Sequence, residues 1–283
     1  MRYFASLAIL LVALCGCICV KQNSNPEVLL KEQLHHGIEW KKVHAAEGLL
    51  EADLAADEVA QCFQRELAAS VPNSPWRIGC LRVLHQCDSA QRAIYQREIR
   101  AIAFNRQSDG VIHAVETMAK LKLMLSPEET AQLWQYAHED NLLSAYALML
   151  LAINHDESAF AQLWQQFLAG NTTAAFALFY LDAIPELNLG TILAQSRNTQ
   201  YDAGYRAFAF RAYAKFAHYS DASHDELLAR INHEDNTGAL RFYLLTVGDF
   251  ARSNDAALLT PYLSSDEVAL QIASASSLAK IQH

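Results

Sequence analysis

The sequence predicts an all-α protein, a superhelix (solenoid) of antiparallel helix pairs with a repeat of about 30 residues. The pentapeptide Ala-Gln-Leu-Trp-Gln at Ala131–Gln135 recurs at Ala161–Gln165, 30 positions later. Composition points the same way, because the 283 residues include only 10 Gly and 6 Pro, while Ala and Leu abound and runs of Val, Ile and Thr are scarce. With 52% hydrophobic residues, the chain can bury a continuous core.

The first 25 residues have the pattern of an export leader followed by a tether. Met1-Arg2 is a short positive start, and residues 3–14 are apolar, too few to span a bilayer but suited to a secretory signal. The segment Leu14-Cys15-Gly16-Cys17 resembles the bacterial lipobox, with Cys15 as a departure from its usual small middle residue. That resemblance implies a signal peptide over 1–16, lipidation of Cys17 and a polar tether over 17–25. Ordinary cleavage near the same place, which would leave a soluble secreted protein, is the alternative.

Residues 26–125 are predicted to form an N-terminal helical region. Helix formers fill 26–70, with interruptions at Gly37 and Gly48, and the clearest turn of the chain is Val71–Pro75. Further helices are expected over 76–86, 90–105 and 111–125, with Ile94, Ile99 and Ile102 turned inward.

Helical repeats are expected over 126–283, opening at Ser126-Pro127, where the serine caps the helix and the proline fits its first turn. Leucine or isoleucine occupies matching places in successive first helices, at Leu133, Leu163, Ile192, Leu227 and Leu258. The first helices are expected at 127–138, 157–169, 187–196, 223–232 and 255–263, and the second helices at 140–153, 171–184, 201–217, 235–252 and 265–281.

The turns recur as well. His138–Asn141 reappears as His233–Asn236 between the two helices of a unit, and His155–Glu157 matches His224–Glu226 where a first helix begins. Asp and Asn at such places accept hydrogen bonds from the free N–H groups of the next helix. The histidines of these turns are interpreted as solvated loop residues.

This pattern of period and turns resembles the HEAT and armadillo families of α-solenoids, clearly over 127–283 and less so over 75–125. The resemblance implies protein binding along a concave surface lined by second helices. Arginine and tyrosine dominate binding hot spots. We therefore predict a partner groove built from Arg206, Phe210, Tyr213, Arg241 and Tyr243.

Three cysteines follow the leader, at Cys62, Cys80 and Cys87. Folding the segment before Pro72 against the segment after Pro75 places Cys62 opposite Cys80, which favours that disulfide in an oxidising compartment. Cys87 is the alternative partner if the helix ends before it, and three buried thiols are the other alternative.

The remaining patterns favour a protein without an enzymatic site. The net charge of −9 disfavours nucleic acid as a partner. No nucleotide-binding, metal-ligating or nucleophilic motif occurs in the sequence, so we expect no cofactor, no metal and no catalytic residues.

The sequence therefore leads to a non-enzymatic cell-envelope lipoprotein that acts as a scaffold or adaptor for an unidentified protein. We expect it on the periplasmic side, held to the outer membrane by the lipid on Cys17. The alternatives are a peptidoglycan- or glycan-active periplasmic enzyme with a helical superhelix, and a soluble secreted inhibitor or immunity-type module.

Overall fold

The computed structural model describes residues 25–250 and 252–283. Over these residues the chain is helical, without strands, and its helices pack in neighbouring pairs, so the predicted all-α solenoid is confirmed. The proposed signal peptide and Cys17 lie outside the described residues. Among the helices that are described, none combines the length and the hydropathy needed to span a bilayer.

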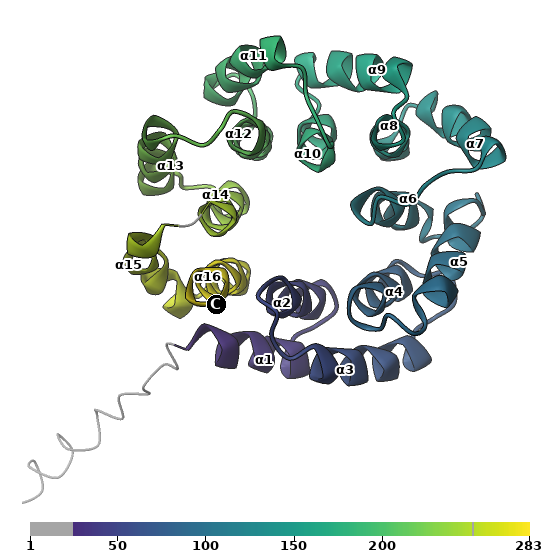
Figure 1. Ribbon diagram of the computed structural model, residues 1–283, viewed down its shortest axis with the longest axis horizontal. Helices are drawn as coiled ribbons and strands as arrows, with labels where there is room; N and C mark the ends of the chain where they lie inside the picture. The colour runs from purple at the N-terminus through teal and green to yellow at the C-terminus, as the bar shows by residue number, and fades with distance from the viewer. Residues whose placement is uncertain (1–24, 251) are drawn as a thin grey trace, which may run out of the picture.

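Each pair contributes one helix to an outer layer and one to an inner layer (Figure 1). The outer helices are α1 (Pro26–His36), α3 (Ala56–Ala69), α5 (Arg92–Ala103), α7 (Pro127–Ala137), α9 (Glu157–Leu168), α11 (Glu186–Arg197), α13 (Asp221–His233) and α15 (Ala256–Leu259). The inner helices are α2 (Trp40–Glu51), α4 (Pro75–Cys87), α6 (Val111–Lys120), α8 (Leu142–Ile153), α10 (Thr172–Tyr180), α12 (Ala203–Phe216), α14 (Thr237–Asp249) and α16 (Val268–Gln282).

The solenoid closes on itself. Each inner helix contacts the next inner helix along the chain, and the last one, α16, packs against both α1 and α2. The result is a ring in which the inner helices surround a common axis (Figure 1). The same pairing of helices already holds over 26–125. Position 126 is therefore where the repeat can first be recognised in the sequence, and the architecture does not change there.

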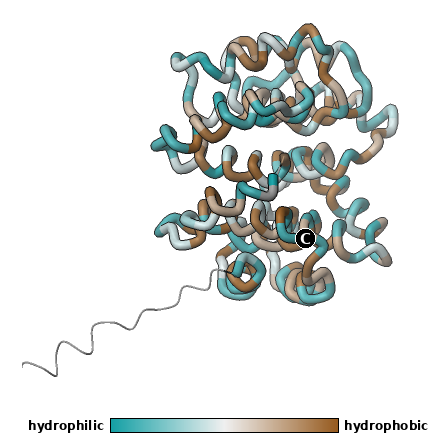
Figure 2. Tube along the Cα trace, turned by 60° about the vertical axis from the view of Figure 1, so that its left-hand side comes forward, coloured by the Kyte–Doolittle hydropathy of each residue, from teal (hydrophilic) through white to brown (hydrophobic). Residues whose placement is uncertain are grey.

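Polar caps explain where many of the helices begin. Ser126 and Glu129 form a reciprocal capping box at the start of α7. Asn141 and Asn236 accept backbone N–H groups at the starts of α8 and α14, as the repeated turns predicted. Hydrophilic residues gather at the turns that join the helices, whereas apolar segments lie along the helices themselves (Figure 2).

The predicted repeat fails in detail at α13 and at the last first helix. Ser220 caps α13, so His224 lies inside that helix and is buried, contacting Asp255 at 3.2 Å, instead of being a solvated turn residue. The predicted helix over 255–263 is a short α15 between two 3-10 helices, Ser253–Asp255 and Thr260–Ser264, because Pro261 lacks the N–H that an α-helix needs.

The matching apolar positions form the core with one shift. Leu133, Leu163, Ile192 and Leu227 are fully buried, whereas in the last repeat Leu259 is buried in place of Leu258. Ile99 and Ile102 point inward as predicted, but Ile94 does not, since 49% of it is exposed.

The predicted Cys62–Cys80 disulfide is wrong, as is the alternative with Cys87. All three cysteines are free thiols, and Cys62 and Cys80 are buried. The Cys62 thiol lies 3.6 Å from the carbonyl oxygen of Leu34, and that of Cys87 donates to Val83 within its own helix. Burial raises the pKa of the Cys80 thiol to about 12, so it behaves as a small apolar residue.

Candidate functional site

The five residues of the predicted groove do not share one surface. Phe210 and Tyr243 are buried between the helix layers, and Tyr213 is partly buried beside them. Arg206 lines a pocket among α11 to α14, and the edge of Tyr243 contributes to the same pocket. Arg241 instead faces the axis of the ring. The structure therefore places Arg206 and Tyr243 at one site and Arg241 at another, and Phe210 and Tyr213 line neither.

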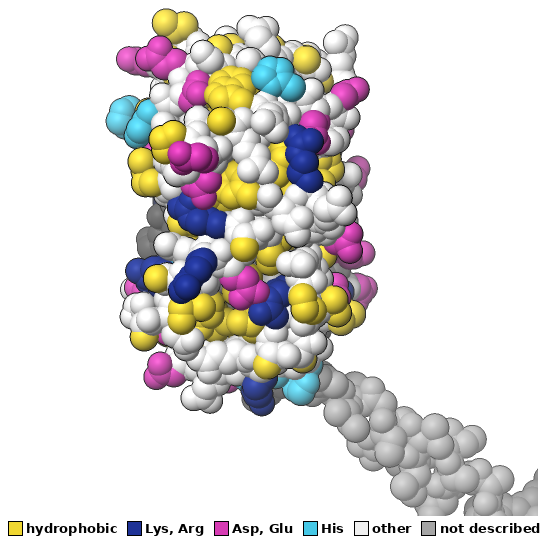
Figure 3. All heavy atoms as spheres, turned by 90° about the vertical axis from the view of Figure 1, so that its right-hand side faces the viewer, with side chains coloured by type: hydrophobic (Ala, Val, Ile, Leu, Met, Phe, Trp, Pro, Cys, Tyr) yellow, Lys and Arg dark blue, Asp and Glu magenta, His cyan; other side chains and the backbone are white. Residues whose placement is uncertain are grey.

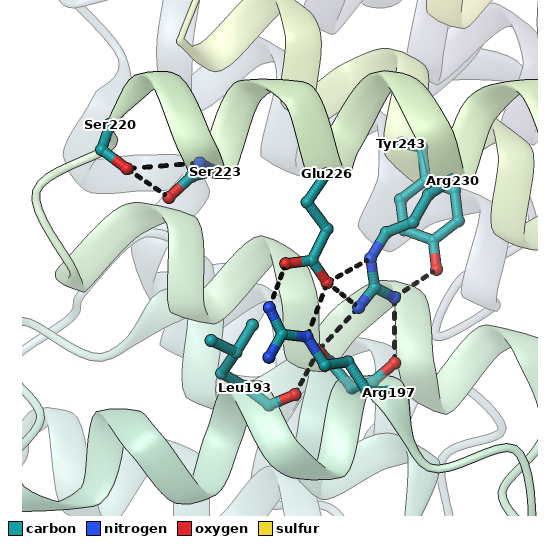
Figure 4. Close-up of polar contacts among 8 residues, drawn as sticks. Leu193, Arg197, Ser220, Ser223, Glu226, Arg230 and Tyr243 are labelled. Atoms are coloured by element: carbon teal, nitrogen blue, oxygen red, sulfur yellow. Dashed lines mark hydrogen bonds and ion pairs between the residues drawn. The ribbon is translucent and has the colours of Figure 1, made fainter.

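The first site, here the arginine pocket, is an open hollow of about 320 Å³. It is lined by Ser196, Arg197, Arg206, Glu226, Ala229, Arg230, His233, Glu234 and Tyr243. Glu226 of α13 lies at its centre and binds two arginines at once (Figure 4). Arg197 reaches Glu226 from α11 at 2.6 Å, and Arg230 reaches it from one turn further along α13, also at 2.6 Å.

Arg230 is fixed by its surroundings. Its guanidinium donates to Glu226, to the carbonyl and hydroxyl oxygens of Ser196, and to the hydroxyl of Tyr243 at 3.3 Å (Figure 4). It also lies 4.5 Å from the ring centre of Phe210. With its donors used in this way, Arg230 holds α11, α13 and α14 together and has little capacity for an external ligand.

Arg197 and Arg206 retain capacity for a ligand. The Arg197 side chain is 58% exposed, although two of its N–H groups bind Glu226. The Nε of Arg206 is buried and has no hydrogen-bond partner among the described residues. Its Nη2 makes only a long contact of 3.9 Å with the carboxylate of Glu234. Three arginines and two glutamates line the pocket, so it is positive in a chain whose net charge is −9.

The outer wall differs from this pocket. On the side of the ring that holds α5 and α7, basic and acidic side chains are interspersed among apolar ones (Figure 3). Such a mixture is typical of a solvated surface.

The second site, here the axial cavity, is a half-enclosed space of about 270 Å³ inside the ring of inner helices. Its lining comes from α2, α6, α10, α12, α14 and α16, so it exists only because the ring is closed. The lining residues are His44, Glu47, Gly48, Glu51, Glu116, Lys120, Phe176, Tyr180, Arg211, Arg241, Phe242, Leu245, Ile272, Ala273 and Ser276.

Ion pairs join the inner helices around this cavity. The four pairs that matter here are Arg82–Glu47 at 2.7 Å, Lys120–Glu116 at 2.7 Å, Arg211–Asp249 at 2.6 Å, and Lys280–Glu51. Lys280 also lies 3.1 Å from Asp249, which connects two of these pairs. Three of the four pairs cross between helices, so they fix the relative positions of α2, α4, α12, α14 and α16.

Two carboxylates of the cavity, Glu47 and Glu116, stay ionised in spite of burial. Burial alone would raise the pKa of Glu47, but Arg82 and the hydrogen bond from His44 hold it well below its usual range. In the same way Lys120, His113 and Arg82 outweigh burial and lower the pKa of Glu116 to about 2. Burial, together with Arg241 and Arg82, lowers the pKa of His44, which favours its neutral form.

Arg241 is the one cation lining the axial cavity that forms neither a hydrogen bond nor an ion pair with the part of the chain that the structure describes. Its guanidinium lies 5.3 Å from the ring centre of Phe242, its neighbour on α14. Burial and the nearby Arg211 lower the pKa of Arg241, while Glu47 opposes this shift.

No protein-family model matches this sequence, and comparisons with curated proteins and with solved structures likewise find no match. Both sites therefore have to be interpreted from their own chemistry. Among the described residues, no group of three or more His, Cys, Asp and Glu is placed to hold a metal ion.

Sequence reasoning found Arg206 and Arg241 but missed the carboxylates around them. Glu47, Glu116 and Asp249 lie far apart in the chain and meet only at the ring axis. A signal for them does exist in the sequence, because each is a charged residue within the apolar stretch of an inner helix.

Proposed function

We propose that this protein is a non-enzymatic cell-envelope lipoprotein that acts as a protein-binding scaffold. In this proposal the lipid on Cys17 anchors the chain to the outer membrane, and the HEAT-like ring of helix pairs presents binding surfaces on the periplasmic side. The partner is a protein with an acidic segment, which binds in the arginine pocket.

The observation that carries this proposal is the unused capacity of Arg206 and Arg197. The Arg206 side chain is 25% exposed and forms no hydrogen bond with the described residues, and the Arg197 side chain is 58% exposed. Because a guanidinium group pairs strongly with a carboxylate, an Asp or Glu side chain of a partner would bind the accessible part of the Arg197 or the Arg206 side chain. Because the protein as a whole is acidic, an acidic partner is attracted to this positive pocket and repelled by the net charge of the rest of the chain.

The pocket is rigid enough to serve as a docking site. Arg230 and Glu226 are locked into the surrounding helices by several hydrogen bonds, so their side chains pay little further entropy when a partner binds. Tyr243 and Phe210 support them from below, which is the arrangement of aromatic and arginine side chains found in binding hot spots.

The test is photo-crosslinking in cells that produce the protein, with the crosslinker at Ala229 on the pocket wall. A defined partner band is expected with the unmodified pocket and is expected to disappear in Arg197→Glu and Arg206→Glu variants. Arg97→Glu, on α5 of the outer wall, makes the same charge change at an exposed position and should leave the band intact.

Two results would contradict the proposal. One is a crosslinked band that is equally strong in the Arg206→Glu, Arg197→Glu and Arg97→Glu variants, because the arginine pocket would then play no part. The other is cell-wall hydrolysis by the purified protein on a zymogram, which would favour the peptidoglycan-active alternative.

A further inference from the structure

The charges around the axial cavity balance except for one arginine. Glu47, Glu116, Asp249 and Glu51 are each paired with a cation, from Arg82, Lys120, Arg211 and Lys280 respectively. Arg241 is the fifth cation and has no carboxylate of its own. The four ion pairs and Arg241 together therefore carry one excess positive charge, although Arg82, Lys280 and Asp249 lie outside the cavity lining. The excess charge is on the Arg241 guanidinium, which lines the cavity.

An unpaired cation in such a place is costly. Taking an ion out of water carries a penalty of several kcal/mol unless a counter-charge compensates it. The Arg241 side chain is partly buried at the cavity wall, and burial lowers its pKa.

The wall beside Arg241 is aromatic and apolar. Phe242 and Leu245 come from the same helix, and Phe176 and Tyr180 face the cavity from α10. The rings of Phe176 and Tyr180 pack at 4.9 Å between their centres, and Phe208 fills the space between Phe176 and Phe242. The ammonium group of Lys120 lies 5.2 Å and 5.5 Å from the ring centres of Phe176 and Tyr180, so a flat or apolar group would lie on the parts of this aromatic wall that Lys120 leaves uncovered.

From this arrangement we propose that the axial cavity binds a small organic monocarboxylate, whose carboxylate pairs with Arg241 and whose apolar or aromatic body lies on Phe176, Tyr180 and Phe242. This site lies apart from the arginine pocket and goes beyond the scaffold function. Its ligand is a small molecule, and the partner protein of the scaffold is not needed for it.

The size and the charge of the cavity both restrict the ligand. A volume of about 270 Å³ corresponds to roughly nine water molecules at the density of the liquid. That is below the usual range for drug-sized ligands and suits a compound about as large as benzoate. A dianion is disfavoured, because its second charge would face Glu47 and Glu116 with no cation left to compensate it.

The experiment is a calorimetric titration of the purified protein with benzoate, compared with titrations with neutral benzamide and dianionic phthalate. Benzoate is expected to bind saturably, whereas benzamide and phthalate should bind at least about tenfold more weakly, a difference of about 1.4 kcal/mol. Arg241→Gln removes the charge and should weaken benzoate binding by a similar factor. Arg97→Gln, on the outer wall, should leave it unchanged, and Arg206→Gln reports any benzoate that binds in the arginine pocket.

Several outcomes would overturn the inference. Equal binding of benzoate and benzamide would show that the charge of Arg241 plays no part. Loss of benzoate binding in Arg206→Gln with no loss in Arg241→Gln would place the ligand in the arginine pocket. Absence of saturable binding of both benzoate and hexanoate at millimolar concentration would mean that the cavity holds only water.

A second measurement covers the case in which Arg241→Gln does not fold. Crystals of the unsubstituted protein soaked with 4-bromobenzoate should show anomalous bromine density inside the axial cavity, against the aromatic wall that includes Phe176 and Phe242. Density elsewhere, or none, would contradict the site. Neither result bears on the partner protein of the scaffold, which is tested at Ala229 by crosslinking.

Discussion

Gly48 of α2 lies directly against Ser276 of α16, where the last helix of the chain meets the first inner helix. A methyl group at Gly48 would lie 2.9 Å from Ser276 Cβ and closer still to its hydroxyl oxygen, so the contact leaves no room for a side chain. On the other side of α16, a methyl group at Gly248 of α14 would lie 2.7 Å from the Cα of Ser277. The ring thus closes through a helix held between two glycines.

Gly48→Ala and Gly248→Ala are therefore expected to destabilise the fold. Alanine favours a helix over glycine by about 1 kcal/mol, but overpacking a tight helix contact costs typically 1–3 kcal/mol. The larger effect is expected at Gly248, because the Cα of Ser277, 2.7 Å from the added methyl group, belongs to the backbone of α16 and cannot rotate away. Urea unfolding of each variant measures the change in free energy.

Gly190 supplies the matched control for the closure contacts. It lies within α11, and no atom stands within 4 Å of an added methyl group. Gly190→Ala should stabilise the protein by up to about 1 kcal/mol, since only the helix preference changes. If all three alanine variants shifted the unfolding free energy in the same direction, close packing at Gly48 and Gly248 could not be the reason for their glycines.

Glu116 is expected to make the stability of the ring sensitive to acid. Its folded pKa is lowered from 4.5 to about 2, so the folded state binds the carboxyl proton less readily than the unfolded state. The stabilisation is fully present above pH 4.5 and is lost as the pH falls toward 2. A shift of this size corresponds to roughly 3 kcal/mol at neutral pH.

Glu116→Gln tests this pH dependence. The variant should be less stable than the parent at pH 7, and the two should converge near pH 2, which thermal unfolding between those values can follow. Glu32→Gln, at an exposed position of α1, provides a control that should track the parent throughout. A constant offset between Glu116→Gln and the parent at every pH would contradict the ion-pair origin of the effect.

The local structure was predictable because it follows from short-range patterns. The repeated Ala-Gln-Leu-Trp-Gln places Leu133 and Leu163 in the core of α7 and α9, and Asn141 and Asn236 cap the helices that their turns introduce. These features depend on a few consecutive residues and on the helical period.

Ring closure was not predictable in the same way, because it depends on contacts between the two ends of the chain. Gly48 was interpreted as a helix interruption, whereas it lies within α2 and allows α16 to approach. The axial cavity follows from that closure, so its carboxylates could not be assembled from sequence. His224 shows a second limit of prediction from sequence. The tripeptide His224–Glu226 repeats His155–Glu157, but α13 begins earlier, at Asp221, so His224 lies inside the helix and is buried.

Arg82 and Glu47 are expected to be strongly coupled. The Arg82 side chain is only 3% exposed, and its Nε donates to Glu47 at 2.7 Å. Arg82→Met leaves the mostly buried carboxylate of Glu47 without its main partner, which typically costs 3–5 kcal/mol. Adding Glu47→Gln removes the unpaired charge and should restore part of that loss.

Urea unfolding of the two single variants and the double variant forms a double-mutant cycle for this pair. The double variant should be more stable than Arg82→Met alone. Additive losses, with a coupling energy near zero, would mean that the contact between α2 and α4 is maintained by the surrounding apolar packing and not by the ion pair.

Cys17 is expected to determine where the protein resides. If the lipobox resemblance holds, Cys17→Ser removes the acylated residue, and the protein should move from the membrane fraction to the soluble fraction or remain as unprocessed precursor. Cys15→Ser is the matched control two positions away, since serine is compatible with the middle of a lipobox and Cys17 stays available. Fractionation with carbonate washing, together with metabolic labelling by palmitate, measures both variants. Labelling that persists in Cys17→Ser, or a parent protein that is soluble and unlabelled, would favour the soluble secreted module and would leave the scaffold without its anchor.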